Sequence, residues 1–143
     1  MSVMQEKIAS NLYYDRLFDI EAAKIGPGEY YYTDQDMLIV TVLGSCISAC
    51  IRDPVAGVGG MNHFMLPQGA KADMDNPVSE SMRYGNYAME VLINQLMRNG
   101  AKRENLEAKI FGGGNVLRSF TTNMVGDRNA EFVKKYLKEE GIK

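Results

Sequence analysis

The sequence MLIVTVLGSCISACI, residues 37–51, carries the strongest strand signal in the chain and a cysteine near its centre. Its first half, 37–43, is apolar almost throughout, which predicts a strand covered on both faces. The pair Gly44-Ser45 interrupts the apolar run, and residues 47–51 then alternate as the residues of a strand do. The stretch therefore predicts Cys46 at a tight turn between two strands.

A returning strand at 58–66 follows a predicted turn at 53–57 and carries His63, the one histidine of the chain. Nearly equal numbers of residues separate Cys46 and His63 from this turn, so an antiparallel hairpin would bring them to a similar level. A thiol is a good nucleophile as the thiolate, and an imidazole is the usual group that takes its proton. The spacing favours a Cys–His hydrolase that acts on a carboxamide. The alternative is a buried thiol and a buried histidine that never meet.

Neighbouring residues are candidates for supporting roles at such a site. Backbone amides at Gly44 and Ser45 can bind an oxyanion, because glycine permits a close approach of the backbone. The hydroxyl groups of Thr41 and Ser45 are both candidates for orienting the imidazole or binding the substrate amide. Both are equally compatible with ordinary strand and turn roles. Cys50 lacks this setting, and we expect it to be structural.

The composition predicts one globular domain that needs no metal or cofactor. Of the 143 residues, 45% are hydrophobic and 24% are charged, and the net charge of −2 gives no electrostatic footprint for nucleic acid. The two cysteines would lie about 13 Å apart on one strand, whereas a disulfide needs Cα atoms within about 7 Å. With one histidine and no paired ligand spacing, a metal site is not predicted. A polar start without a long apolar run predicts a cytoplasmic protein with no direct membrane insertion.

The remaining elements predict an α/β (α+β) layered sandwich, in which mixed or antiparallel sheets are flanked by two main helices. Residues 1–21 are expected to form a loose helical extension ahead of a single domain at 22–143. Within that domain the expected elements are strands at 22–25, 30–33 and 107–111, a helix at 79–99 stopped by Gly100, and a last helix capped by Asp127 or Asn129 that runs through Glu140.

Two loops are predicted to lie near the site. The polar segment 67–77 follows the histidine strand directly and is expected to form a rim or lid. The run Gly112-Gly113-Gly114-Asn115 lacks the glycine and lysine spacing of a nucleotide-binding loop. We therefore expect this run to be a turn at a sheet edge that lines the Cys–His cleft.

Several motifs in this order resemble the CheD family of chemoreceptor glutamine deamidases. The similarity extends from about Lys24 to the end of the chain and includes Gly126-Asp127-Arg128-Asn129 at the last helix. Its most specific motifs are Leu43-Gly44-Ser45-Cys46, Asp53-Pro54, His63-Phe64-Met65-Leu66-Pro67 and Lys109-Ile110-Phe111-Gly112-Gly113-Gly114-Asn115.

The resemblance implies a cysteine hydrolase that converts particular receptor glutamines to glutamates. It implies Cys46 as the nucleophile, His63 as the base and Thr41 as the third residue. It also implies methyl-accepting chemotaxis receptors as substrates, a CheC-type phosphatase as a partner, and an architecture shared with bacterial toxin deamidases. Family members usually continue past the last helix with further strands, so a domain that ends at Lys143 would lack some C-terminal strands.

Other functions fit parts of the same pattern. A non-catalytic adaptor that binds receptors or a phosphatase would leave receptor masses unchanged, and its binding would survive Cys46→Ala. A thiol protease or a transglutaminase would instead cleave the backbone or incorporate an amine. The mass of a receptor peptide after incubation with the protein separates these alternatives.

Overall fold

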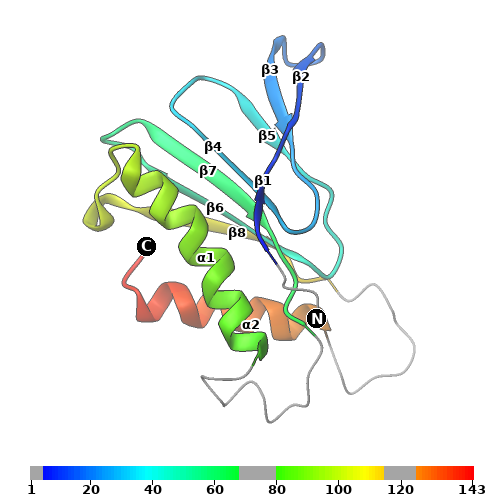
Figure 1. Ribbon diagram of the computed structural model, residues 1–143, viewed down its shortest axis with the longest axis vertical. Coiled ribbons are helices and arrows are strands. Elements are labelled where there is room, and N and C mark those ends of the chain that lie inside the picture. The colour runs from blue at the N-terminus through cyan, green and yellow to red at the C-terminus, as the bar shows by residue number, and fades with distance from the viewer. Residues whose placement is uncertain (1–4, 68–79, 115–124) are drawn as a thin grey trace.

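The computed structural model describes residues 5–67, 80–114 and 125–143, which form two β-sheets and two α-helices (Figure 1). The strands, in chain order, are β1 (Lys7–Ile8), β2 (Asn11–Asp15), β3 (Ile20–Lys24), β4 (Glu29–Thr33), β5 (Leu38–Val40), β6 (Ile47–Asp53), β7 (Val58–His63) and β8 (Glu107–Gly112). The helices are α1 (Glu80–Arg98) and α2 (Val125–Glu139), and a 3₁₀ helix spans Arg103–Asn105.

The larger sheet has the strand order β1-β4-β7-β6-β8, and the smaller sheet has the order β2-β3-β5. Both are mixed sheets, because β1 pairs parallel with β4 and β3 pairs parallel with β5, whereas the other pairs are antiparallel. The predicted fold class, an α+β layered arrangement with two main helices, is confirmed.

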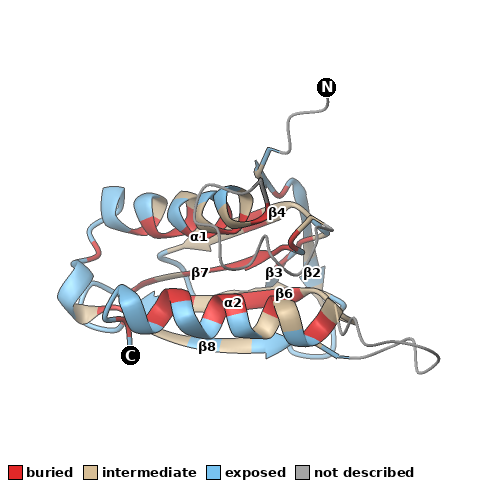
Figure 2. Cartoon of the chain, turned by 90° about the horizontal axis from the view of Figure 1, so that it is seen from below, coloured by how far each residue is buried: buried red, intermediate tan, exposed pale blue. Residues whose placement is uncertain are grey.

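Alternation along β6 gives the larger sheet two different faces. Ala49 and Ile51 belong to the main core with buried residues of α1 and α2, whose buried side chains run as a stripe along each helix (Figure 2). Cys50 points to the opposite face, where it packs with Met61 and with Ile25 at the end of β3. The sheet is therefore covered by helices on one face and partly by the second sheet on the other.

The N-terminal helix expected at 1–21 is wrong. Residues 11–15 pair antiparallel with β3, and the N–H of Ala9 donates to the Tyr30 carbonyl at 2.8 Å. Leu12, Leu17 and Phe18, which follow one another at roughly helical spacing, are 57%, 86% and 65% exposed. Their spacing imitates a helix, but they bury no common face, so pairing with β3 and β4 decides the structure. The boundary between an extension and a domain at residue 22 stays a prediction.

The long strand expected at 37–43 is also wrong in its extent. Only Leu38–Val40 forms a strand, at the edge of the smaller sheet, and its residues are half-buried rather than covered on both faces. The last backbone bond of this ladder runs from the Ile25 N–H to the Val40 carbonyl, at 2.9 Å. At the next position the Thr41 side chain, rather than its backbone, binds Ile25. The strand therefore ends before the loop that carries Cys46, residues 41–46, which is called the cysteine loop below.

The strands expected at 22–25, 30–33, 47–51 and 107–111 are confirmed, as are α1, the stop at Gly100 and the 53–57 turn. Met97 is 41% exposed, so it does not belong to the buried stripe of α1. The predicted cap of α2 is wrong, because the helix already begins at Val125 and both Asp127 and Asn129 lie inside it. The loop expected at 67–77 and Asn115 lie outside the described residues, apart from Pro67.

The last two residues lie beside the larger sheet. Ile142 is buried, and the Lys143 carbonyl accepts the Ala108 N–H of the edge strand β8 at 2.6 Å. Within the described ranges, neither helix is long and apolar enough to cross a membrane.

Candidate active site

The β6–β7 hairpin brings the cysteine and histidine segments together. Its register pairs Asp53 with Val58 and continues to an isolated bridge between Ile47 and Phe64. In this register His63 lies opposite Ser48, two positions along β6 from Cys46. Cys46 directly precedes β6, and continuing the strand alternation by one residue would place its side chain on the face that carries His63.

The imidazole of His63 is held by Thr41. Its Nδ1 lies 2.7 Å from the Thr41 Oγ1, and this hydroxyl donates to the Ile25 carbonyl at 2.8 Å. A hydroxyl has a single proton, and here the carbonyl takes it. Thr41 must therefore accept from His63, which assigns the neutral imidazole the tautomer with its proton on Nδ1.

The other ring nitrogen, Nε2, is buried and has no hydrogen-bond partner among the described residues. His63 is only 3% exposed, and burial lowers the pKa of its imidazole below the ordinary value. The ring is therefore neutral near pH 7, and Nε2 carries an unused lone pair. Nε2 can therefore accept a proton, and no donor among the described residues binds it.

The Cys46 thiol is half-buried on the same face. Burial raises the pKa of this thiol, and its own backbone N–H partly opposes the rise. Burial thus raises the pKa of the thiol and lowers that of the imidazole, and both shifts favour a neutral thiol beside a neutral imidazole. Nucleophilic attack then requires proton transfer at the moment of reaction rather than a preformed ion pair.

The glycine run at 112–114 holds the backbone of the cysteine loop. The Gly113 N–H donates to the Cys46 carbonyl at 2.8 Å, and the Gly114 N–H donates to the Gly44 carbonyl at 3.0 Å. Gly112 has φ of +103°, and a Cβ at this position would overlap the Cys46 carbonyl oxygen. Only glycine fits here, because the backbones approach too closely for a side chain.

The two candidate hydroxyls differ in their surroundings. The Thr41 hydroxyl contacts His63, whereas the Ser45 hydroxyl faces the Met65 sulfur at 4.0 Å. Asn62 points to the opposite face from His63, where its Oδ1 accepts the Ala49 N–H at 2.9 Å.

Asn129 is the residue at this site that the sequence did not identify. It is fully buried, its Nδ2 donates to the Ser45 carbonyl at 2.9 Å, and its Oδ1 accepts the Leu66 N–H at 3.1 Å. The neighbouring Arg128 donates to the carbonyls of Leu66 and Pro67. In the sequence, Asn129 belongs to the Gly126-Asp127-Arg128-Asn129 motif of the family resemblance, and its own predicted role is a cap of the last helix.

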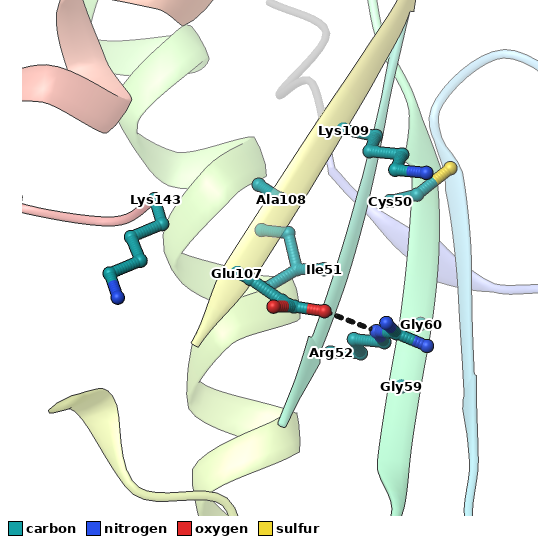
Figure 3. A pocket seen from close by; sticks show the side chains of 9 residues that line it. All are labelled: Cys50, Ile51, Arg52, Gly59, Gly60, Glu107, Ala108, Lys109 and Lys143. Atoms are coloured by element: carbon teal, nitrogen blue, oxygen red, sulfur yellow. Dashed lines mark hydrogen bonds and ion pairs between the residues drawn. The ribbon is translucent and has the colours of Figure 1, made fainter. Parts of the chain in front are cut away.

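A separate groove of about 480 Å³ lies beside β8 (Figure 3). Cys50 and Lys109 lie close together at one end of it, and Arg52 pairs with Glu107 at 2.5 Å. Neither Cys46 nor His63 lines this groove, so it is distinct from the Cys–His site. In the described part of the chain, no three His, Cys, Asp or Glu side chains are grouped as a metal site.

Comparisons with known proteins point to one family. The family described as "CheD chemotactic sensory transduction" matches residues 65–143. The "Probable chemoreceptor glutamine deamidase CheD" of Methylobacillus flagellatus is 69% identical over 140 residues, which are 98% of this chain and 69% of the relative. The protein of the same name from Thiobacillus denitrificans is 68% identical over 142 residues, 99% of this chain and 70% of the relative.

A solved structure is also similar, at a lower level. The crystal structure of the Bacillus licheniformis hypothetical protein YfiH aligns with a TM-score of 0.43 and 14% identity, over 99% of this chain and 62% of that chain.

Proposed function

This chain belongs to the CheD family, and from that premise we propose that it deamidates glutamine side chains of chemoreceptors, converting them to glutamates with release of ammonia. The names of its relatives support the substrate and the reaction. The observation that carries the mechanism is the His63 imidazole, held through Nδ1 by Thr41 and unpartnered at Nε2. A neutral imidazole in that tautomer is a competent base for the Cys46 thiol.

The first half of the reaction forms a thioester. His63 Nε2 takes the proton of the Cys46 thiol, and the thiolate attacks the side-chain carbonyl carbon of the substrate glutamine. Backbone amides near Ser45-Cys46 stabilise the oxyanion of the tetrahedral intermediate. When the intermediate collapses, the C–N bond breaks and His63 gives its proton to the departing nitrogen, which leaves as ammonia.

The second half hydrolyses the thioester. A water molecule enters the position that ammonia has left, and His63 Nε2 takes one of its protons as it attacks the thioester carbon. The C–S bond breaks, the proton returns from His63 to the Cys46 sulfur, and the product is a glutamate side chain. Thr41 accepts from Nδ1–H throughout, so the imidazolium that forms in each half keeps its orientation.

The thiol has to reach Nε2 for this mechanism to operate. The bridge between Ile47 and Phe64 holds the residues next to Cys46 and His63 together, and the mechanism requires a rotation of the cysteine side chain to bring the sulfur to Nε2 when substrate is bound. Catalytic hydrogen bonds that are absent without substrate often form only in the complex.

The two cysteines provide a matched test. We expect Cys46→Ala to abolish ammonia release from a purified receptor signalling fragment, and Cys50→Ala to retain most of it. The fragment should gain the mass of an amide-to-acid conversion with the wild type but not with Cys46→Ala. Full activity of Cys46→Ala would refute a thiol mechanism. A receptor fragment that binds without any mass change would favour the adaptor alternative, and a cleaved backbone would favour a protease.

Two further elements belong to this proposal. A cytoplasmic location is supported by the receptor signalling segments that such an enzyme modifies. A CheC-type phosphatase as partner is supported by the family resemblance. Co-purification of the chain with a CheC protein from the same organism, compared with an unrelated phosphatase, tests the second element.

A further inference from the structure

Asn129 joins the two segments that carry the proposed catalytic pair. It lies near the start of α2 and is fully buried. It binds the Ser45 carbonyl, directly before the thiol residue, and the Leu66 N–H, three residues after His63. A buried amide that satisfies two backbone groups fixes both of them, because losing either bond would leave a buried polar group unpaired.

The bond to Ser45 orients the peptide unit that includes the Cys46 N–H. In a trans peptide the C=O and N–H groups point in opposite directions, and the described residues contain no cis peptide bond. With the Ser45 carbonyl directed at α2, the Cys46 N–H is directed away from α2. The effect of this N–H on the pKa of its own thiol agrees with that orientation, because it opposes the rise that burial causes.

The carbonyls on either side of Ser45 are held by the glycine run. The Gly44 carbonyl accepts from the Gly114 N–H, and the Cys46 carbonyl accepts from the Gly113 N–H. Asn129 therefore binds the middle one of three successive carbonyls. Without its bond, the Ser45–Cys46 peptide unit could rotate between two anchored neighbours.

We infer that Asn129 is a positioning residue for the nucleophile, which sets the Ser45–Cys46 peptide so that the Cys46 N–H faces the thiol and the developing oxyanion. The part that concerns the oxyanion rests on the proposed function. The part that concerns the thiol does not depend on any substrate. An N–H directed at a thiolate stabilises it, so a rotated peptide makes the thiol harder to ionise.

Asn129→Asp separates this role from simple packing. Aspartate has nearly the same size and still accepts the Leu66 N–H, but it puts an acceptor oxygen against the Ser45 carbonyl. We expect the pH midpoint for alkylation of Cys46 by iodoacetamide to rise by about one pH unit. With a receptor fragment, kcat should fall about 100-fold, the lower end of the roughly 10²–10³-fold that loss of one oxyanion donor costs, while KM changes less than about threefold.

Two controls show whether a change in the Cys46 midpoint results only from a general loss of protein stability. Asn62→Asp alters an equally buried asparagine, which binds the backbones of Ala49 and Ala88 and does not touch the cysteine loop. Alkylation of Cys50, read from its own peptide by mass spectrometry, serves as an internal standard. Asn62→Asp should leave the Cys46 midpoint unchanged, and Asn129→Asp should leave that of Cys50 unchanged.

The inference is overturned if Asn129→Asp leaves the Cys46 midpoint at the wild-type value, or if Asn62→Asp moves it equally. A carboxylate beside the cysteine loop would raise the midpoint by its charge alone, so the neutral variant Asn129→Gln, which displaces the amide by one methylene, must raise it as well. An unchanged Cys46 midpoint in Asn129→Gln also overturns the inference. If the wild type releases no ammonia from any receptor fragment, the proposed function fails. The alkylation experiment still decides the role of Asn129 in that case.

Discussion

At the scale of single residues, the Thr41 hydroxyl determines which nitrogen of His63 is free to act as a base. The hydroxyl gives its proton to the Ile25 carbonyl and so can only accept from Nδ1–H. A valine at this position has nearly the same shape but offers no acceptor. The imidazole could then carry its proton on Nε2, where the ring cannot deprotonate the thiol.

We therefore predict that Thr41→Val lowers kcat for deamidation about 10- to 100-fold, part of the roughly 10²–10⁴-fold that a general base supplies. KM should change little, because Thr41 orients the base and does not bind the receptor. Thr41→Ser keeps the hydroxyl and should restore most of the rate. Equal rates for the valine and serine variants, measured by ammonia release, would show that the hydroxyl is not needed.

Residues of the site were predictable where a local pattern supported them. Cys46 and His63 follow from one hairpin, and Thr41 precedes the cysteine by five positions. Asn129 was not predictable in the same way, because its two partners are 84 and 63 residues away in the chain. Only the tertiary fold, in which the start of α2 meets the segment before β6 and the segment after β7, brings these groups together.

At the scale of elements, the glycine turn after β8 acts as a backbone support for the cysteine loop. Gly112 and Gly100 provide a matched comparison, since their φ angles are +103° and +104°. A Cβ at Gly112 would overlap the Cys46 carbonyl, whereas a Cβ at Gly100 would meet no atom within 4 Å. Alanine is strained to a similar degree at both positions, but only at Gly112 does it displace the site.

We predict that Gly100→Ala lowers the free energy of unfolding by about 1 kcal/mol, the approximate cost of a left-handed conformation for alanine. Gly112→Ala should cost about 1–3 kcal/mol more, because the backbone must shift to relieve the overlap. It should also reduce deamidation at temperatures where the variant stays folded. Urea unfolding of both variants checks the difference, and equal destabilisation would mean that the turn does not support the loop.

The helices and strands that were correctly predicted share one property. The apolar residues that define their sequence pattern are the residues that they bury. The helix α1 buries Met89, Leu92, Ile93 and Leu96, and β6 places Ile47, Ala49 and Ile51 in the main core. The N-terminal residues do not form the expected helix, because Leu12, Leu17 and Phe18 have helical spacing but are exposed and bury no common face. Apolar residues at helical or strand spacing predict a helix or a strand only when the face they form is buried. Exposed apolar residues can have the same spacing without forming either.

At the scale of the whole molecule, the burial of His63 depends on the packing of the two sheets. Its strand belongs to the larger sheet, whereas Thr41, which binds its ring, follows the edge strand of the smaller sheet. The imidazole is 3% exposed as a result. Because the chain has one histidine, the protonation of this single ring reports on the packing of both sheets.

Burial lowers the pKa of His63 below the 6.5 of an ordinary histidine. At pH values between the folded and unfolded pKa, the unfolded chain binds more protons, so the free energy of unfolding rises with pH. The stabilisation is fully present above the unfolded value and is lost as the pH falls through the folded pKa. We therefore predict that the wild type is less stable to urea at pH 5 than at pH 7.

The variant His63→Gln isolates this contribution, because glutamine does not titrate but still offers a donor and an acceptor to Thr41. Other groups that titrate nearby are common to both proteins. Among them is Glu6, whose pKa burial raises and whose effect on stability has the opposite sign, being lost as pH rises. The loss of stability between pH 7 and pH 5 should therefore be larger in the wild type than in His63→Gln. An equal loss would mean that the imidazole is hydrated in solution, and that the two sheets do not enclose it.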